Sequence, residues 1–219
     1  AVVGTGLAAM TNNGTITHNG SGWTLTSAAF TNSANATTTL SSTTISLTLD
    51  STATFANSGQ ITVSGAWTVN SSGATITNDG TITNNGDNWD FNDTSFTNSS
   101  DKTVTYAGTA ITMERSFTQS GTFDLSGKTI TFDDSTSADD TTTTCSGSLG
   151  GTVVITKNSD GDFINSSGCG ISLGADPTTT IDITAANDFV NNGTVIVSSG
   201  TWAVVGTGLA AMTNNGTIT

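Results

Sequence analysis

Apolar and polar residues alternate over short runs of this chain, as in Trp67-Thr-Val-Asn and Ile61-Thr-Val-Ser. Alternation with a period of two, rich in β-branched residues and bounded by Gly, Asn and Ser, is typical of short β-strands. Leu, Glu, Lys, Gln and Arg are scarce, so helix signals are absent. One Pro and 25 Gly fit many tight turns between strands. The pattern therefore predicts an all-β chain.

A bulky residue recurs along the chain and opens each step of a repeat with a period of about 22 residues. The first five openers are evenly spaced, whereas the later intervals vary, which indicates that the register slips in the second half. A step of this length holds about three short strands and cannot bury its own apolar face, so equivalent steps must stack. The openers are Trp23, Ile45, Trp67, Trp89, Ile111, Ile130, Val153, Thr180 and Trp202.

A second marker accompanies the openers: a bulky residue, then a small or variable residue, then an amide. The bulky residue and the amide are two positions apart, so they lie on the same face of a strand. Stacked at about 4.8 Å, each inward amide can hydrogen-bond to the next, as in the amide ladders of cross-β structures. The alternative is that these amides are exposed turn formers. The predicted ladder comprises Asn12, Asn32, Asn57, Asn78, Asn98, Gln119, Asn165 and Asn191.

Together the two markers predict a parallel β-helix, that is, a β-solenoid of about nine coils of about 22 residues, uncapped at both ends. Residues 1–219 then form one continuous solenoid, and large residues of successive coils stack above one another inside it. One amide is missing from the pattern, in the Asp/Thr-rich stretch 139–144. The predicted core stacks comprise Trp23, Trp67, Trp89, Trp202, Phe30, Phe55, Phe96, Phe117, Phe163 and Phe189.

Residues 1–17 and 203–219 have the same sequence, AVVGTGLAAMTNNGTIT. Self-similarity at a fixed period is the signature of repeat architectures. We therefore expect residues 1–202 to be one repeat unit and residues 203–219 to be the start of the next. The partners of the chain are then copies of itself, joined end to end as covalent tandem repeats or as a head-to-tail polymer. The identical ends favour the covalent route.

The charge balance excludes some classes of partner. Four Lys and Arg residues against 17 Asp and Glu give a formal net charge of −13. With no basic patch to neutralise phosphates, we expect no binding to nucleic acid or to an anionic membrane surface. No apolar run is long enough to insert into a membrane. The composition agrees with an extracellular or cell-surface location.

The two cysteines occupy similar places in successive steps. Cys145 follows the opener Ile130, and Cys169 follows the opener Val153, at intervals that differ by a single position. Stacked strands are about 4.8 Å apart, inside the Cα window of about 4.4–6.8 Å that a disulfide requires. We therefore predict a Cys145–Cys169 disulfide, which fits an oxidising compartment. The alternative is a pair of free buried thiols.

Two acidic clusters are the remaining candidates for chemistry. Their carboxylates are hard oxygen ligands that suit Ca²⁺, although such clusters are usually solvated loops. With one His and no Arg near the clusters, the sequence lacks a catalytic arrangement, so we expect no enzyme and no cofactor other than Ca²⁺ at these loops. The clusters consist of Asp133, Asp134, Asp139 and Asp140, and of Asp160 and Asp162.

Several N-x-S/T sequons occur in this chain, which is rich in Asn, Ser and Thr. Asn13 and Asn192 lie beside the inward amides and are the better candidates for glycosylation. Asn98 and Asn165 also belong to sequons, but as ladder residues they should stay unmodified.

T-x-T pairs also recur, and flat Thr arrays on β-solenoids are used by ice-binding proteins. The positions after the openers drift to Asp90, Glu114 and Asp133, which breaks a flat uncharged face and disfavours ice binding. Thr is, more simply, a good exposed strand residue. The pairs are Thr15/Thr17, Thr24/Thr26, Thr81/Thr83, Thr103/Thr105 and Thr129/Thr131.

The line Trp67-Thr-Val-Asn-Ser-Ser-Gly-Ala-Thr-Ile-Thr-Asn-Asp-Gly-Thr-Ile-Thr, with its N-x-G-x-I pattern, resembles the coils of β-helical surface repeat proteins of bacteria and archaea. The whole chain is similar to filamentous haemagglutinins and to the passenger stalks of autotransporters. This resemblance implies a right-handed parallel β-helix that is displayed at a cell surface as an adhesin or rigid stalk. Repeats in those families diverge along the chain, whereas the overlap here is perfect.

We therefore expect a structural repeat unit of an extracellular filament or cell-surface fibre that polymerises by continuous solenoid stacking. The main alternative is the stalk of a surface adhesin. An ice-binding or polysaccharide-active β-helix is less favoured.

Overall fold

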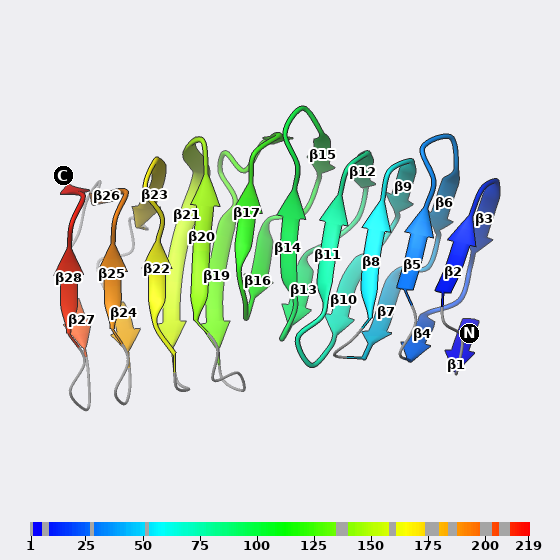
Figure 1. The fold of residues 1–219 in the computed structure, drawn as a ribbon, viewed down its shortest axis with the longest axis horizontal. Helices are drawn as coiled ribbons and strands as arrows, with labels where there is room; N and C mark the ends of the chain where they lie inside the picture. Colours follow the sequence, from blue (N-terminus) through cyan, green and yellow to red (C-terminus); the bar gives the residue numbers. More distant parts are fainter. Residues whose placement is uncertain are drawn as a thin grey trace.

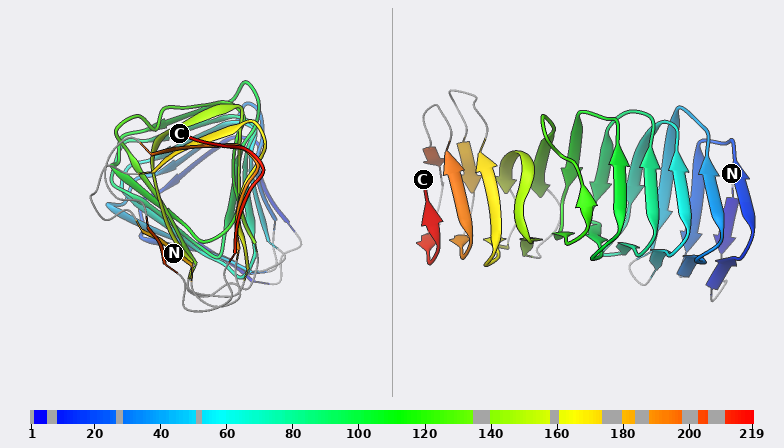
Figure 2. Two further views of the ribbon diagram at one scale, coloured as in Figure 1. Left: turned by 90° about the vertical axis from the view of Figure 1, so that its left-hand side faces the viewer. Right: turned by 90° about the horizontal axis from the view of Figure 1, so that it is seen from above.

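The computed structural model describes residues 2–5, 9–26, 29–50, 53–134, 140–157, 161–173, 180–183, 188–197, 203–205 and 211–219. Every regular element in these residues is a β-strand, and the strands form three sheets. Figure 1 shows the coils side by side along the long axis, with the two termini at opposite ends. Seen along that axis, the sheets are the walls of a triangular prism (Figure 2). The predicted all-β parallel β-solenoid is confirmed, and residues one predicted step apart, such as Trp67 and Trp89, are paired.

The first wall, sheet B, is a ten-stranded path in the described part of the chain. Apart from β20, its strands carry the bulky residue and the amide on one face, because alternate side chains of a strand point to the same face. In the strands between the two end coils, again apart from β20, both residues are buried. Its strands are β2 (Ala9–Asn12), β5 (Ala29–Asn32), β8 (Thr54–Asn57), β11 (Thr75–Asn78), β14 (Ser95–Asn98), β17 (Phe117–Gln119), β20 (Thr141–Cys145), β22 (Phe163–Asn165), β25 (Phe189–Asn191) and β28 (Met212–Asn214).

The second wall, sheet C, follows sheet B in each of the first coils. Its six strands pair in parallel, with registers such as Ile61 beside Ile82. The strands are β3 (Thr15–His18), β6 (Thr37–Leu40), β9 (Gln60–Val63), β12 (Thr81–Asn84), β15 (Thr103–Tyr106) and β18 (Thr122–Phe123).

Sheet A has 13 strands in the part of the chain that the structure describes. It forms the third wall and, in the later coils, the second wall as well. This happens at β21, an 11-residue strand in which Gly147 pairs with Cys169 and Thr152 pairs with Thr129. The strands are β1 (Val2–Thr5), β4 (Gly22–Thr26), β7 (Thr44–Leu49), β10 (Ala66–Asn70), β13 (Trp89–Asn92), β16 (Ala110–Met113), β19 (Thr129–Asp134), β21 (Gly147–Lys157), β23 (Cys169–Leu173), β24 (Thr180–Ile183), β26 (Thr194–Val197), β27 (Ala203–Val205) and β29 (Thr217–Ile218).

The predicted pairing of openers is correct over several coils, but it is wrong near the N-terminus. Trp67 pairs with Ile45 on one side and with Trp89 on the other, as predicted. Trp23, however, pairs with Leu47, two residues beyond the predicted partner Ile45. A shift of two residues keeps the same side chains facing inward, because strand side chains alternate with a period of two. The hydrophobic pattern therefore cannot detect this shift.

The second correction concerns Thr180, which is wrongly predicted as an opener. Thr156 pairs with Asp182, one residue away from the partner that the predicted register requires. The opener Val153 instead pairs with Leu173, so Thr180 does not continue the column of openers. The intervals between openers vary in this half of the chain, so spacing alone cannot fix a register in which a slip of one residue matters.

Large side chains fill the interior of the solenoid. Neighbouring ring centroids lie 4.8 Å apart between Phe30 and Phe55, and 5.7 Å apart between Phe163 and Phe189. Such pairs add about 0.5–1.5 kcal/mol to the effect of burial. Trp202, a further predicted core residue, lies outside the described residues. The predicted core residues that are buried are Trp23, Trp67, Trp89, Phe30, Phe55, Phe96, Phe117, Phe163 and Phe189.

Glycine is required at the corner between the first and second walls. A Cβ atom at Gly80 would lie 2.2 Å from the carbonyl oxygen of Gly59, and one at Gly193 would lie 2.2 Å from that of Cys169. The backbone of one coil thus approaches the next closely enough that only Gly fits. This contact explains why Gly follows the amide by two positions in the N-x-G pattern.

Tyr106 is the single tyrosine and joins the second wall to the third. Its hydroxyl donates to the Ala110 carbonyl and accepts from the backbone N–H of Trp89. Burial raises the pKa of Tyr106 to about 12. The folded chain therefore holds this proton more tightly than the unfolded chain. The resulting contribution to stability is present below about pH 10 and is lost as the pH rises toward 12.

We expect absorbance titration of tyrosinate to give a midpoint near pH 12 for the folded chain, as the raised pKa requires. The urea-unfolded chain serves as the control and should titrate near about pH 10. Because the chain has one tyrosine, the signal belongs to Tyr106 alone. Equal midpoints in the folded and unfolded chains would contradict the buried hydroxyl.

Candidate functional site: the amide ladder and the repeated coil

The inward amides of sheet B form a hydrogen-bonded ladder, as predicted. Asn12 Nδ2 donates to Asn32 Oδ1 over 2.9 Å, and the bond repeats from coil to coil. In every rung the nitrogen donates to the following coil, so the ladder has a direction along the solenoid. The next bonds join Asn32 to Asn57, Asn57 to Asn78, Asn78 to Asn98 and Asn98 to Gln119, over 2.8–3.0 Å.

The amides also bond to the backbone at the corner between the first and second walls, in their own coil or in the next one. Asn57 Nδ2 donates a second bond to the Thr81 carbonyl over 3.0 Å, and Asn78 Nδ2 donates to the Thr103 carbonyl over 3.3 Å. Asn78 Oδ1 also accepts the backbone N–H of Gly80 over 3.3 Å. These bonds satisfy amide groups that are buried away from water. The alternative interpretation of these residues as exposed turn formers is therefore wrong.

The ladder is interrupted at β20, in the coil where the sequence lacks an amide. Gln119 pairs with Cys145 on one side of this strand, whereas Thr143 pairs with Asn165 on the other, so the register shifts by two residues. Gln119 Nε2 donates to the Gly121 carbonyl of its own coil over 2.9 Å. The buried hydroxyl of Thr143 donates to Asn165 Oδ1 over 2.9 Å and starts a second ladder.

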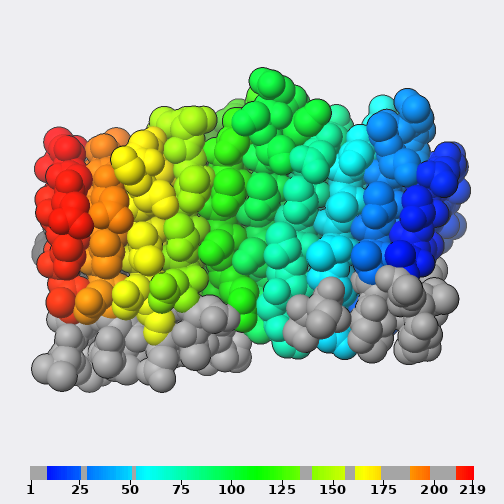
Figure 3. All heavy atoms as spheres, viewed as in Figure 1, coloured from blue at the N-terminus to red at the C-terminus, as the bar shows by residue number. Residues whose placement is uncertain are grey.

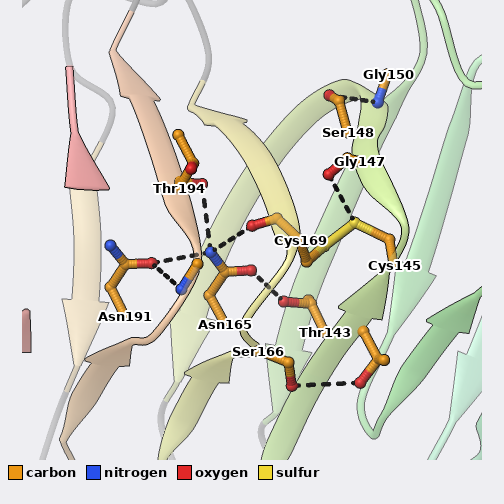
Figure 4. Close-up of a disulfide and its surroundings, with 12 residues drawn as sticks. Thr143, Cys145, Gly147, Ser148, Gly150, Asn165, Ser166, Cys169, Asn191 and Thr194 are labelled. Atoms are coloured by element: carbon orange, nitrogen blue, oxygen red, sulfur yellow. Dashed lines mark hydrogen bonds between the residues drawn. A yellow bond between two sulfur atoms is a disulfide. The ribbon is translucent and has the colours of Figure 1, made fainter. Parts of the chain in front are cut away.

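A disulfide between Cys145 and Cys169 crosses this break (Figure 4). The two Cα atoms are 4.6 Å apart. The structure corrects the argument that led to this pair, because the cysteines do not share a row. Cys145 lies opposite Gln119 in the first wall, and Cys169 lies opposite Gly147 in the next. The disulfide thus links two coils across a corner, at the place where an amide rung is missing.

The second ladder runs into the repeated sequence at the C-terminal end. Asn165 Nδ2 donates to Asn191 Oδ1 over 2.9 Å, and Asn191 Nδ2 donates to Asn214 Oδ1 over 2.8 Å (Figure 4 shows the first of these bonds). Its direction is the same as that of the first ladder. Asn214 occupies the position in residues 203–219 that Asn12 occupies in residues 1–17.

The two copies of the repeated sequence take the same places at opposite ends of the solenoid (Figure 1). β1 and β27 lie in the third wall, β2 and β28 in the first. β3 and β29 both follow that strand around the Gly corner into the second wall. The identical sequences therefore form equivalent coils, one at each end.

The two copies of the repeated coil each pack against one neighbouring coil, and they do so through opposite faces. Met10 pairs with Phe30 of the coil that follows it, whereas Met212 pairs with Phe189 of the coil that precedes it. The first and last coils form the two ends of the molecule in Figure 3. Met212 is 38% exposed as a result. Between them, the two copies show which residues contact each face of the same coil.

The candidate glycosylation sites lie outside the ladder. Asn13 is exposed, and its Oδ1 accepts a hydrogen bond from Ser33 Oγ over 2.6 Å. The Oδ1 of the half-buried Asn192 accepts one from Asn215 Nδ2 over 3.0 Å. The sequon residues Asn98 and Asn165, by contrast, are fully buried in the ladders. Glycosylation of Asn13 and Asn192 stays a prediction.

The acidic clusters are described only in part. Asp139, Asp160 and the side chain of Asp134 lie outside the described part of the chain. Asp140 and Asp162 lie on successive coils, where Asp140 Oδ1 accepts the backbone N–H of Asp162 over 3.0 Å. Among the described residues, no three His, Cys, Asp or Glu side chains gather in a way that could hold a metal ion. Binding of Ca²⁺ at these loops stays a prediction.

An uncharged threonine face covers the second wall from β3 to β18, which corrects the expectation that the T-x-T pattern is broken. The acidic positions that motivated that expectation follow the openers and belong to the third wall. Gln60 is the one other residue in the two outward columns, which end before the exposed Asp124. The columns are Thr15, Thr37, Gln60, Thr81, Thr103 and Thr122, and Thr17, Thr39, Thr62, Thr83 and Thr105.

No protein-family model, curated protein or solved structure matches this chain. Within the described residues, no helix has the length and apolar character needed to span a membrane. The fold and the site define a class of protein: a parallel β-solenoid with internal amide ladders and a repeated coil.

Proposed function

We propose that this chain is a structural repeat unit of an extracellular filament or cell-surface fibre, built by continuous stacking of solenoid coils. The observation that carries this proposal is the repeated coil, which lies at both ends with opposite faces covered. In the proposed array, one coil takes the place of both copies and keeps the contacts of each. Phe189 and Phe30 then flank the Met10 position, and Asn191 and Asn32 flank the Asn12 position.

The amide ladder supports the same junction. Asn191 donates to Asn214 over 2.8 Å, and Asn12 donates to Asn32 over 2.9 Å. Asn214 and Asn12 are equivalent positions, so in an array one residue accepts from the preceding unit and donates to its own. The hydrogen bonds keep one direction through the junction, and no buried amide loses its partner.

The function that follows is mechanical. Backbone hydrogen bonds between parallel strands run along the axis, while aromatic and amide columns fill the interior. Ten strands of the first wall span the distance between equivalent coils, and each of the nine steps between them advances about 4.8 Å. Each unit would thus lengthen a fibre by about 43 Å. The disulfide, the acidic surface and the resemblance to surface β-helices support an extracellular location.

The stalk of a surface adhesin is the alternative, and it uses the same solenoid to hold a separate binding domain away from the cell. Ice binding ranks below both, because the threonine columns cover six strands while the ladders and core continue beyond them. Polysaccharide cleavage ranks below them as well, because the sequence offers no Arg near its clustered carboxylates.

The mass of the native polypeptide, measured under denaturing conditions with and without reductant, tests the proposal. We expect a mass many times the 22.0 kDa of this chain, unchanged by reduction, because the identical segments favour covalent tandem repeats. A finite chain with a distinct terminal domain would favour the adhesin stalk. A short polypeptide that forms no fibre would contradict the filament function.

A further inference from the structure

The C-terminal copy of the repeated sequence covers one face of the preceding coil, to which it is joined by specific hydrogen bonds. Asn191 Nδ2 donates to Asn214 Oδ1 and to the Thr217 carbonyl over 2.8 and 3.1 Å. The Asn191 carbonyl accepts the backbone N–H of Asn215 over 2.8 Å, and the Gly193 carbonyl accepts that of Thr217 over 2.9 Å. Around these groups, the strands β24, β25 and β26 lie on the three walls and pair with β27, β28 and β29.

Residues 1–17 of a second copy carry the same groups in the same order. Asn12, Asn13 and Thr15 stand where Asn214, Asn215 and Thr217 stand in the repeated sequence. In its own chain this coil uses its other face, since Asn12 Nδ2 donates to Asn32 and to the Thr37 carbonyl. The coil can therefore keep its own contacts while it binds a second chain.

We infer that residues 203–219 are an exchangeable cover, and that the β24–β25–β26 face binds residues 1–17 of a second copy of this chain when the cover leaves. The exchange reproduces the backbone pairings that β27, β28 and β29 make, so each junction is a continuous solenoid. Repetition of this head-to-tail contact gives an open filament of separate chains. The inference rests on the proposed function, because it uses the same junction, but it specifies the noncovalent route and identifies a segment that blocks it.

Two glycines allow this exchange to be tested with matched variants. A Cβ atom at Gly216 would lie 2.0 Å from the Gly193 carbonyl oxygen, so Gly216→Ala displaces the cover. A Cβ atom at the equivalent Gly14 has nothing within 4 Å in its own chain, so Gly14→Ala leaves the fold intact. In the exchanged junction, however, Gly14 takes the place of Gly216, and the same added atom would meet Gly193 of the second copy.

Sedimentation velocity of the full chain over a range of concentrations measures the exchange. We expect the wild-type chain and Gly14→Ala to stay at 22.0 kDa, and Gly216→Ala to form species several times heavier that grow with concentration. The double variant Gly14→Ala/Gly216→Ala should return to 22.0 kDa. Hydrogen exchange of residues 211–219 checks that Gly216→Ala has released the cover. A chain ending at residue 202 provides a second way to expose the face and should assemble in the same way.

The inference is overturned if both chains with an exposed face stay monomeric, or if Gly14→Ala does not block their assembly. It is also overturned if the wild-type chain assembles as readily as Gly216→Ala, because residues 203–219 would then cover nothing. A failure of exchange leaves the proposed function intact, since covalent tandem repeats need no second chain. A failure of the proposed function would appear instead as a short native polypeptide that forms no fibre.

Discussion

Replacing Asn78 by alanine is expected to lower the free energy of unfolding by about 3–5 kcal/mol, the largest effect that we expect of a single substitution in this chain. Asn78 lies in the middle of the first ladder and is fully buried. Its removal takes the acceptor from Asn57 Nδ2 and the donor from Asn98 Oδ1, both over 2.8 Å. It also leaves the backbone N–H of Gly80 without its side-chain acceptor. Buried polar groups that lose their partners cost about 1–3 kcal/mol each.

Denaturant unfolding followed by tryptophan fluorescence measures this loss. The matched control is Asn85→Ala, which removes the same amide from an exposed position in the same coil and should change stability by no more than about 0.5 kcal/mol. Equal effects of the two substitutions would show that the hydrogen bonds of the ladder do not stabilise the fold.

A double variant then separates the ladder from single-site effects. Asn78→Ala combined with Asn98→Ala removes both ends of one hydrogen bond and should cost less than the sum of the single changes. Residues that share a network show coupling of about 0.5–3 kcal/mol. Strict additivity would mean that the two amides act independently, contrary to the bond between them.

Replacing both Cys145 and Cys169 by serine is expected to lower the stability of the chain by roughly 3 kcal/mol. The disulfide closes a loop with a sequence separation of 24 residues, and the chain-entropy model assigns about this value to a loop of that length. It also joins two coils at the ladder break, where Gln119 bonds within its own coil. We therefore expect the loss to concentrate in β20, β22 and β23.

Hydrogen exchange resolved by segment checks this prediction together with denaturant unfolding. Residues 141–173 should exchange faster in the double serine variant, while residues 54–98 should keep the protection of the wild-type chain. Reduction of the wild-type chain should have the same effect, and reductant added to the serine variant should have none. Uniformly faster exchange along the whole solenoid would show that the disulfide does not act at the break.

The amide ladder could be predicted from the sequence for two reasons. The amides recur with the period of the coil, and buried amides require hydrogen-bond partners. An amide two residues after a bulky residue must face inward, and a buried amide must find a partner. Asn57 and Asn78 satisfy both conditions. The Gly corner belongs to the same pattern, but its cause is visible only when Gly80 is seen against the Gly59 carbonyl. The role of Thr143 could not be predicted, because one hydroxyl in a run of threonines carries no signal of its own.

The pairing of strands shows where sequence reasoning reaches its limit. Constant spacing places Trp67 beside Trp89 correctly. The loop between two strands can, however, absorb two residues without changing which side chains face inward. The pairing of Trp23 with Leu47 and the shift across β20 are both of this kind. The packing of neighbouring coils decides between such registers, and the hydrophobic pattern is the same for both.

The sequence by itself determined the class of fold, the period of each coil, the inward columns and the identity of the two end segments. These properties are local or repetitive, since they follow from alternation, spacing and the solvation of side chains. The tertiary structure alone decided the register at each coil and the break in the amide ladder that the Cys145–Cys169 disulfide crosses. It alone also showed that Met10 and Met212 pair with neighbours on opposite sides. Those properties depend on contacts between residues of different coils, whose relative position no single coil specifies.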